Sequence, residues 1–527
     1  MPPEFDVIVI GSGAAGVHAA HPLVTAGLRV LMLDGGVPAP AILQEPPPGG
    51  FLDMRKRSYD QTRWFVGEDP SELPAQTEMN GMIGGNRDFV TRHTDALLPL
   101  HARGQEEVTQ TLAEGGLASA WGGACTYFDD DQLKSLKLPT EEMRQAYADI
   151  TKMIGVSGPE DHLHVQPALK PDHHARLLLE RAKNRGKKLS ELSAVVRQPH
   201  TAVLTQPLED REPCAYEDLE YYSDAGKSLY RANFTLALLR GFENFTYRPN
   251  IRIEEIKEAE NDVCVRGHHF TEGRPGAPLE EHAKRVILAA GAVGSARILL
   301  QSLGLHGTPL PFISKPHVLT ACLHPRSLGQ AGDRERSGLC QLIATLPGNA
   351  ERAGACAQLY SYRSFLLYRL LPYLPLPLPE SMDILSLLTP SLLIAGIRFA
   401  SEQPNGTLTL SSDGVLSVEI PDRMRMDTRY RNALRQMKRA LRMLGLLPLR
   451  TRFMPEGSAF HYAGTVPADA NADAPLSANQ DGLVRGLKRT YIADASLFPV
   501  LPAEPHTLTI MANARRIGEK IAGLHHA

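Results

Sequence analysis

FDVIVIGSGAAGVHAAHPLVTAGLRVLMLDGG, residues 5–36, starts with an apolar run rich in β-branched residues and leads through three glycines into a helix-compatible stretch. In this GxGxxG pattern Gly11 permits a tight turn, Gly13 lets the backbone approach a pyrophosphate, and Gly16 lets the helix pack closely on its strand. A second apolar strand ends at Asp34, about twenty residues after the glycines, where a carboxylate can bind an adenosine ribose. The glycines alone are a weak signal. Strand, glycines, helix, strand and acid in this order predict a dinucleotide site.

Two distant stretches repeat the strand-to-helix pattern of a nucleotide-binding domain. HAKRVILAAGAVGSARILLQSLG (282–304) is an apolar strand followed by small residues and a helix. LKRTYIADASLFPVLPAEPHTLTIMANARRIGEKIAG (487–523) contains a strand ending at Asp494, then a loop and a helix. An NAD enzyme normally completes this domain in one continuous run of βαβ units. We therefore expect a nucleotide-binding domain assembled from segments far apart in the chain.

Together these segments resemble the glucose-methanol-choline (GMC) family of FAD-dependent oxidoreductases. The resemblance is carried by the N-terminal glycines and by VILAAGAVGSARILL, YIADASLFP and PHTLTIMANARRIGEKI. A further stretch, GGLASAWGGACTYFDDDQL (115–133), is similar to the flavin-contacting loop of the pyranose-oxidase-like branch. The resemblance implies an α/β protein with a Rossmann-type FAD-binding domain assembled from discontinuous segments. It also implies an α+β substrate domain with an antiparallel sheet.

The domain boundaries that the resemblance implies divide the chain into five segments. They are the first part of the FAD-binding domain (1–160, with a lid-like insertion at 41–80), a connecting or substrate-side segment (161–210), the second FAD-binding part (211–305), the substrate-binding domain (306–450) and the C-terminal FAD-binding part (451–527). Alternation around a Ser-Asp-Gly turn predicts a hairpin over 405–420 within the substrate-binding domain. An apolar stripe at helical spacing predicts a helix over 428–445.

The resemblance also implies a set of residues that hold FAD. They are Gly11, Gly13, Ala14, Ala15 and Gly16 for the pyrophosphate, Asp34 and Gly35 for the ribose, Gly115, Gly116, Ser119, Ala120, Trp121 and Gly122 beside the flavin ring, Ile253 for the adenine, and Ala290, Gly291, Asp494, Ala495, His506 and Thr507. In pyranose oxidases a histidine directly before the loop tryptophan is covalently linked to the flavin. Here Ala120 precedes Trp121, so we expect non-covalent FAD.

Two histidines are the candidate catalytic residues. His461 matches the family's His-x-x-Gly-Thr element, and His506 matches its second catalytic position, with Pro505 restricting the backbone before it. Oxidising an alcohol removes a hydroxyl proton and a carbinol hydride, and a neutral imidazole, whose ordinary pKa is near 6.5, suits the proton. The flavin takes the hydride. We expect His461 to be the base and His506 to orient the hydroxyl. The reverse order, and a purely structural role for either histidine, remain alternatives.

Composition excludes several kinds of partner. The 527 residues include 56 Lys and Arg against 59 Asp and Glu, a net charge of −3, so no global field recruits nucleic acid or anionic lipid. The six cysteines lack a CxxC pair, which favours free buried thiols over a zinc or dithiol site, and we expect no metal. The expected partners are a small alcohol or sugar and an electron acceptor, either dioxygen or another compound.

The sequence suggests a cytoplasmic protein, because MPPEFDVIVIGSG runs into the first strand with no leader ahead of it. FLLYRLLPYLPLPLPESMDILSLLTPSLLIAGIRF (365–399) is the most apolar segment, but charges and prolines keep its uninterrupted run below the roughly 20 residues of a membrane span. Two interpretations stay open for it. It forms buried core with a Pro-rich connector, or it forms an apolar surface that receives a hydrophobic substrate or rests on a membrane.

The leading functional hypothesis is flavin-dependent oxidation of an alcohol, with a sugar, glycoside or sugar-containing intermediate favoured by the loop that begins at Gly115. The alternative substrate is a hydrophobic alcohol or a natural-product intermediate. Two other classes are a lyase that keeps FAD without net redox turnover, and a binding or sensor protein with bound FAD.

Overall fold

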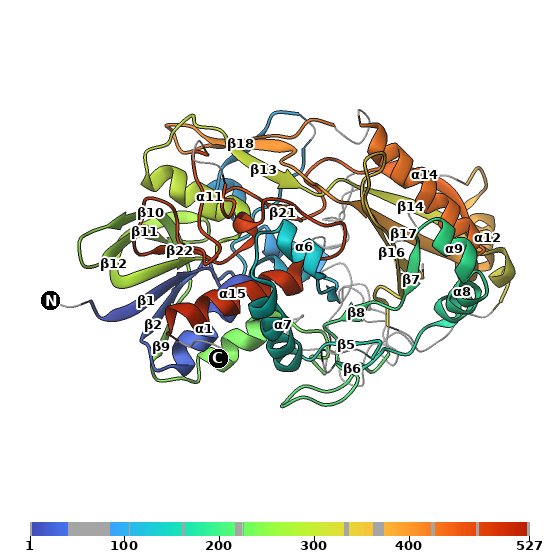
Figure 1. Ribbon diagram of the computed structural model, residues 1–527, viewed down its shortest axis with the longest axis horizontal. Coiled ribbons are helices and arrows are strands. Elements are labelled where there is room, and N and C mark those ends of the chain that lie inside the picture. The colour runs from blue at the N-terminus through green and yellow to red at the C-terminus, as the bar shows by residue number, and fades with distance from the viewer. Residues whose placement is uncertain are drawn as a thin grey trace.

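The computed structural model describes residues 3–40, 85–104, 106–160, 163, 165–216, 224, 226–330, 337–361, 374–422, 427–470 and 474–523 (Figure 1). The expected lid-like insertion at 41–80 lies outside the described residues, as does the beginning of the apolar segment at 365–399.

A seven-stranded sheet forms one half of the protein. It comprises β1 (Phe5–Ile10), β2 (Val30–Leu33), β9 (Phe245–Arg248), β10 (Ile251–Glu258), β11 (Val263–Thr271), β12 (Arg274–Leu288) and β22 (Thr490–Ile492). The strand order is β10-β11-β12-β1-β2-β9, and β22 pairs with β12. β1 is parallel to β12 and β2, β2 to β9, and β12 to β22, whereas β10 and β11 are antiparallel. The Rossmann-type sheet of discontinuous segments is confirmed.

Helices cover both faces of this sheet. Figure 1 shows α11 (Gly291–Ser302) on one side and α1 (Ala14–Thr25) and α15 (Thr507–Ile521) together on the other, with α7 (Thr140–Ile154) beside α15. α1 and α15 approach closely at Gly518, where a Cβ atom would stand 2.3 Å from the backbone oxygen of Ala19. The C-terminal helix is therefore packed directly on the helix that follows the GxGxxG motif.

The other half contains a six-stranded antiparallel sheet in the order β20-β14-β17-β16-β15-β7. Its strands are β7 (Val195–Arg197), β14 (His317–Leu323), β15 (Leu342–Leu346), β16 (Ala355–Ser361), β17 (Leu392–Phe399) and β20 (Leu447–Phe453). α14 (Thr428–Met443) packs on it through a buried stripe that includes Leu434, Met437 and Leu441. The expected antiparallel sheet and amphipathic helix are both confirmed.

A five-stranded sheet holds the segment that directly follows His461. Its order is β21-β13-β18-β19-β3, formed by β3 (Leu100–Ala102), β13 (Leu310–Ser314), β18 (Gly406–Leu410), β19 (Leu416–Glu419) and β21 (Tyr462–Ala463). β18 and β19 form the hairpin predicted over 405–420. β21 pairs with the end of β13, so His461 and Lys315 lie side by side, and the Lys315 N–H donates to the backbone oxygen of His461.

Shorter elements complete the described part of the chain, and the helices and turns named next are those of the described residues. A four-stranded sheet contains β4 (Ala124–Cys125), β5 (Ser157–Gly158), β6 (Gln166–Pro167) and β8 (His200–Thr201). The remaining helices are α5 (Thr94–Leu97), α6 (Asp130–Ser135), α8 (His173–Asn184), α9 (Gly186–Glu191), α10 (Ala232–Leu239) and α12 (Leu378–Leu388). 3-10 turns are η2 (Gly85–Val90), η3 (Gly116–Ala120), η4 (Pro325–Ser327), η6 (Thr389–Ser391) and η7 (Ala495–Leu497).

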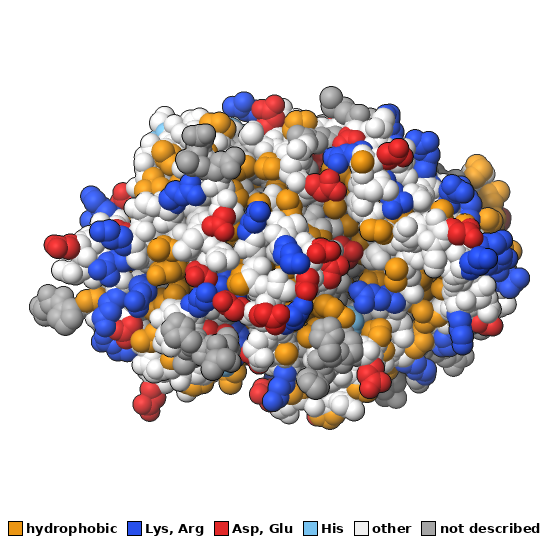
Figure 2. All heavy atoms as spheres, viewed as in Figure 1, with side chains coloured by type: hydrophobic (Ala, Val, Ile, Leu, Met, Phe, Trp, Pro, Cys, Tyr) orange, Lys and Arg blue, Asp and Glu red, His pale blue; other side chains and the backbone are white. Residues whose placement is uncertain are grey.

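The described part of the apolar segment divides between core and surface. β17 is a central strand with Leu393, Ile397 and Phe399 buried, whereas α12 leaves Leu378 63% and Leu387 54% exposed. Among the described residues no helix has the length and apolar character to cross a membrane. On the face shown in Figure 2, basic and acidic side chains are intermingled, so this face carries no extended region of one sign.

Candidate active site

A cavity brings together residues from both ends and the middle of the chain. Three helices begin at it: α1 after Gly13, α11 after Ala290 and α15 after His506. The structure describes every residue of these three helices. None of them has a side-chain cap at its N-terminus or an acidic residue in its first turn. Free N–H groups and the helix dipole favour negative charge at such ends. The cavity is thus suited to an anionic or strongly polar ligand.

Most of the predicted site residues line this cavity. Those that do are Gly11, Gly13, Ala14, Ala15, Asp34, Gly35, Gly116, Ala120, Trp121, Ile253, Ala290, Gly291, His461, Asp494, Ala495, His506 and Thr507. Gly16, Gly115, Ser119 and Gly122 are not part of the lining. Gly16, Gly115 and Ser119 contribute to backbone geometry and packing instead.

The three motif glycines are restricted in different ways. A Cβ on Gly11, whose φ is +102°, would lie 2.6 Å from the backbone oxygen of Ala289, and one on Gly16 would lie 1.8 Å from the backbone oxygen of Gly11. A Cβ on Gly13 would meet nothing closer than 3.8 Å, the distance to the Gly116 Cα. Protein packing therefore requires glycine at the first and third positions. Gly13 leaves open a cradle that a side chain would begin to fill.

Asp34, directly after β2, holds the geometry of the GxGxxG loop. The Ser12 N–H donates to its Oδ1 (3.1 Å), and the hydroxyls of Ser12 and Tyr247 donate to its Oδ2 (2.5 and 2.9 Å). Gly115 N–H donates to the Ser12 hydroxyl oxygen (2.9 Å), which links both glycine-rich loops. Burial raises the pKa of Asp34, and these hydrogen bonds act in the opposite direction. Sequence reasoning missed Ser12 and Tyr247, although Ser12 lies inside the motif.

Asp494 performs a similar task at the beginning of α11. Its Oδ2 accepts from the Ser295 hydroxyl (2.6 Å), and its Oδ1 accepts from the Ser496 N–H (2.8 Å) and hydroxyl (2.5 Å). Burial raises the pKa of this carboxyl, with the hydrogen bonds from Ser295 and Ser496 opposing the effect. The end of β22 is thereby tied to α11 at the cavity wall.

The Gly115 loop forms the tight turn η3. Gly115 and Gly116 have φ of +82° and +61°, in the left-handed region that glycine tolerates best. The Ser119 hydroxyl donates to the backbone oxygen of Glu114 (2.6 Å), and the Trp121 indole N–H donates to the backbone oxygen of Tyr230 (2.7 Å). These contacts fix a rigid wall in which Ala120 and Trp121 face the cavity.

His461 and His506 lie against each other at the cavity. Their ring centroids are 4.7 Å apart and the rings are nearly perpendicular, at 83°. Phe460, directly before His461, has a φ of +58°, a conformation that is strained for an aromatic residue and is held by the surrounding fold. In both rings Nδ1 is buried and has no hydrogen-bond partner in the described chain. The fold brings together two residues 45 positions apart, as the family resemblance implied.

Both imidazoles are strongly biased toward the neutral form. Burial lowers the pKa of His461 and of His506 well below 6.5, and the positive charges of Lys315 and Arg398 lower each pKa further. Burial is the largest cause, since it removes the water that would solvate an imidazolium. A buried, uncharged imidazole is suited to accept a proton from a substrate.

Lys315 and Arg398 are functional candidates that sequence reasoning missed. Lys315 is fully buried, its Nζ donates to the backbone oxygen of Glu504, and burial lowers its pKa to about 7. Arg398 lies near the end of β17 and lines the cavity, with Nη1 donating to the side-chain oxygen of Gln358. The available signal was weak. Each is the single charged residue in an apolar strand sequence, LPFISKPHVL and LLIAGIRF.

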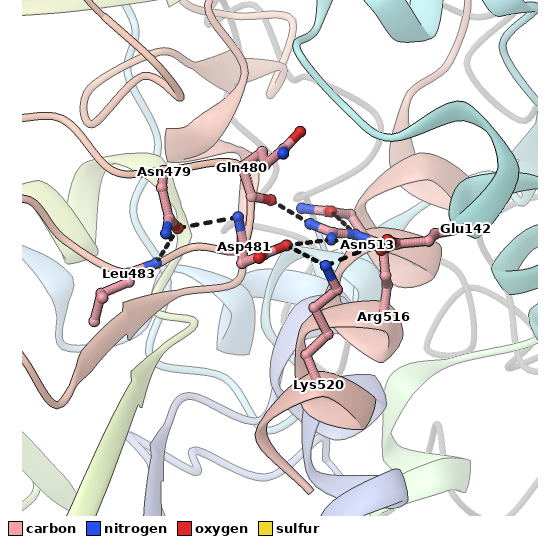
Figure 3. A network of polar contacts seen from close by, with 8 residues as sticks. All are labelled: Glu142, Asn479, Gln480, Asp481, Leu483, Asn513, Arg516 and Lys520. Atoms are coloured by element: carbon pink, nitrogen blue, oxygen red, sulfur yellow. Dashed lines mark hydrogen bonds and ion pairs between the residues drawn. The ribbon is translucent and has the colours of Figure 1, made fainter. Parts of the chain in front are cut away.

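A polar network holds α15, and thus His506 at its N-terminus. Figure 3 shows Arg516, which is 1% exposed, reaching Glu142 Oε2 (3.0 Å) and Asp481 Oδ1 (2.8 Å), with the Gln480 backbone oxygen as a further acceptor. Lys520 donates to the same Asp481 oxygen (2.8 Å). α15 is therefore locked to α7 and to the 479–483 loop.

A second cluster lies away from this cavity. Ligand-type atoms of Cys264, Glu280 and His282 lie within 4.8 Å of one another on β11 and β12. Glu280 also pairs with Arg266 (2.8 Å), and His282 with Asp262 (2.8 Å), so local charges already satisfy these groups. All six cysteines are buried and free, as expected from their spacing.

Comparison with known proteins gives matches among solved structures. No protein-family model and no curated protein sequence matches the chain. Among solved structures, pyridoxine 4-oxidase from Mesorbium loti is similar to it with a TM-score of 0.63 and 15% sequence identity. The similarity covers 99% of this chain and 100% of the oxidase. At this identity the match establishes architecture, and the chain therefore has the fold of pyridoxine 4-oxidase, as the GMC resemblance implied.

Proposed function

We propose that this protein binds FAD non-covalently and oxidises an alcohol to a carbonyl compound. The observation that carries the proposal is the pair of buried, neutral histidines in a cavity where three uncapped helices also begin. The residues fit FAD: Gly13 leaves a cradle for the pyrophosphate, Asp34 lies at the ribose position, and the η3 turn supplies a rigid wall. Ala120 offers no side-chain nucleophile for a covalent bond. When bound, FAD would accept the hydride.

The two histidines would divide the remaining work between them. Nδ1 of each ring is closed off, so Nε2 is the atom left to meet a substrate hydroxyl. In the proposed reaction His461 Nε2 accepts the hydroxyl proton while His506 orients the same oxygen. Losing that proton raises the electron density on the carbinol carbon and so promotes hydride loss. The pKa values support this arrangement, because both imidazoles are neutral before the substrate arrives.

Two features indicate different classes of substrate. The pyranose-oxidase-like Gly115 loop favours a sugar, a glycoside or a sugar-containing intermediate. The leucines exposed on α12 favour a hydrophobic alcohol or natural-product intermediate instead. Pyridoxine, which the name of the structural neighbour gives as its substrate, belongs in the panel of test compounds. The electron acceptor is dioxygen or another small compound, and hydrogen peroxide formation in air separates the two.

The test is an anaerobic absorbance titration of the FAD-loaded protein with sugars, glycosides, aliphatic alcohols and pyridoxine. We expect one class to bleach the flavin, and His461→Ala and His506→Ala to slow bleaching by about a hundredfold or more. His306→Ala is the matched control, since His306 is exposed and does not line the cavity, and it should leave the rate unchanged.

Two outcomes would overturn alcohol oxidation. If a compound is converted while the flavin stays oxidised throughout, the lyase hypothesis replaces it. If the protein binds FAD and ligands but both alanine variants retain full function, a binding or sensor role replaces it.

A further inference from the structure

Arg398 occupies an unusual position for a charged side chain. It lies on β17, a central strand of the six-stranded sheet, with His317 and Cys356 as its cross-strand neighbours on β14 and β16. Its side chain lines the same cavity as His461 and His506, and its charge lowers the pKa of both histidines. The guanidinium therefore approaches the proposed reaction centre from the sheet that would receive the substrate.

The hydrogen-bonding capacity of this guanidinium is largely unused. Nη1 donates to the Gln358 side-chain oxygen, but Nε is buried without a partner, and no carboxylate in the described chain pairs with Arg398. Buried Arg516, in contrast, is paired with two carboxylates. Arg297 also lines the cavity with an unpartnered Nε, but its Nη1 and Nη2 both donate, to two backbone oxygens and to Gln110. A guanidinium that is partly removed from water and lacks an anion is unfavourable. Nε is closed off by burial, so Nη2, which has no hydrogen-bond partner in the described chain, is the group left to meet a ligand.

Among the described residues, no carboxylate forms an ion pair with this guanidinium. The carboxylates that line the cavity are Asp34 and Asp494, and each is occupied by hydroxyl and N–H donors at the glycine-rich end. Glu504 lies beside Lys315 and accepts a hydrogen bond from Gln132 (3.2 Å). Lys315 itself adds positive charge to the same region. The missing anion must therefore come from a ligand.

We infer that the alcohol substrate carries a carboxylate, and that Nη2 of Arg398 binds it through a charge-assisted hydrogen bond. This inference rests on the proposed alcohol oxidation, because it identifies the class of substrate for the same site. The pyrophosphate of FAD is not an alternative anion, since the glycine cradle and the three helix ends are provided for it. Arg398 thereby orients the substrate and selects hydroxy acids over neutral alcohols of the same shape.

The test measures binding of a probe small enough to enter the cavity whatever the substrate's shape. Acetate and its neutral isostere acetamide are titrated with the FAD-loaded protein at constant ionic strength, and broadening of their methyl NMR signals reports binding. We expect acetate to bind at least about tenfold more tightly than acetamide, and Arg398→Gln to remove that preference. Arg435→Gln, an exposed arginine on α14, is the matched control and should retain it.

Arg398→Met, which keeps the apolar stem, replaces the glutamine variant if that variant does not fold. Equal broadening of acetate in the wild type and the Arg398 variant overturns the inference, and so does the absence of any preference for acetate in the wild type. The readout does not depend on flavin reduction. Acetate binding that requires Arg398, together with no flavin bleaching by any hydroxy acid, would contradict alcohol oxidation while leaving the carboxylate site in place.

Discussion

Lys315 shows how one buried side chain can set the protonation of its neighbours. Its pKa is lowered to about 7 by burial, so it gains its positive charge as the pH falls through neutrality. Below that pH its charge opposes protonation of His461 and His506, whose pKa values already lie well below 6.5. The two histidines are therefore kept neutral in the pH range where an isolated imidazole would become charged.

This arrangement predicts the pH dependence of flavin reduction. The proposed reaction requires a neutral imidazole, so the rate should fall only when the pH drops through the lowered histidine pKa. We expect a flat rate from pH 8 to 6 and a decline in more acidic solution. In Lys315→Met, which keeps the apolar stem without the charge, the decline should move upward toward 6.5. Anaerobic stopped-flow measurement of the flavin reduction rate at each pH gives the pH at which the rate is halved. A value at or above 6.5 for the wild type would contradict a lowered histidine pKa.

Among the elements, α15 has to hold His506, its N-cap residue, at the cavity, while its last turn reaches the surface. Gly518 lets it contact α1, and the Tyr147 hydroxyl lies 2.7 Å from the Thr509 hydroxyl. Arg516 and Lys520 then tie its far end to Glu142 and Asp481 (Figure 3). These contacts anchor α15 along its length, which opposes fraying of the helix.

Arg516→Met should therefore destabilise the protein by about 2–3 kcal/mol, since it leaves Glu142 and Asp481 without their buried partner. Flavin reduction should also slow, because the helix that carries His506 loses its anchor. Urea unfolding and the reduction rate are the two measurements. Arg435→Met, on the exposed face of α14, is the control and should change stability by less than about 0.5 kcal/mol. Equal stability of the two variants would show that packing alone holds α15.

For the protein as a whole, the sequence predicted what local patterns encode. The β1-α1-β2 unit, the β18-β19 hairpin and α14 each appear where periodicity and turn residues placed them. The discontinuous sheet and the contact between His461 and His506 were predicted only through family resemblance. The paired strands of the sheet are hundreds of residues apart, and other strands separate the two histidines in the sequence. Lys315 and Arg398 were missed for the same physical reason. Their environments are created by tertiary contacts between β13, β17 and the segment before α15, which no local pattern records.

Buried histidines also govern how the folded protein responds to acid. Burial lowers the pKa of His18 and of His317 to about 3, and His461 and His506 are shifted in the same direction. Below pH 6.5 the unfolded chain binds protons at these positions and the folded chain does not. Above pH 6.5 these histidines therefore leave the free energy of unfolding unchanged. As the pH falls below 6.5, they lower it. Each contributes a loss of about 1.4 kcal/mol per pH unit. The raised pKa values of Asp34 and Asp494 act in the opposite direction.

His18→Gln isolates one of these contributions. The glutamine amide can replace the ring Nε2, which lies 3.0 Å from the Tyr230 hydroxyl, but it does not titrate. Between pH 6 and 5 the free energy of unfolding should fall less steeply for the variant than for the wild type, by about 1.4 kcal/mol per pH unit. Urea unfolding at several pH values and one FAD concentration measures the slopes, with exposed His269→Gln as the control that keeps the wild-type slope. If the wild type and His18→Gln lose stability in parallel, His18 is protonated in the folded state, and burial does not keep it neutral.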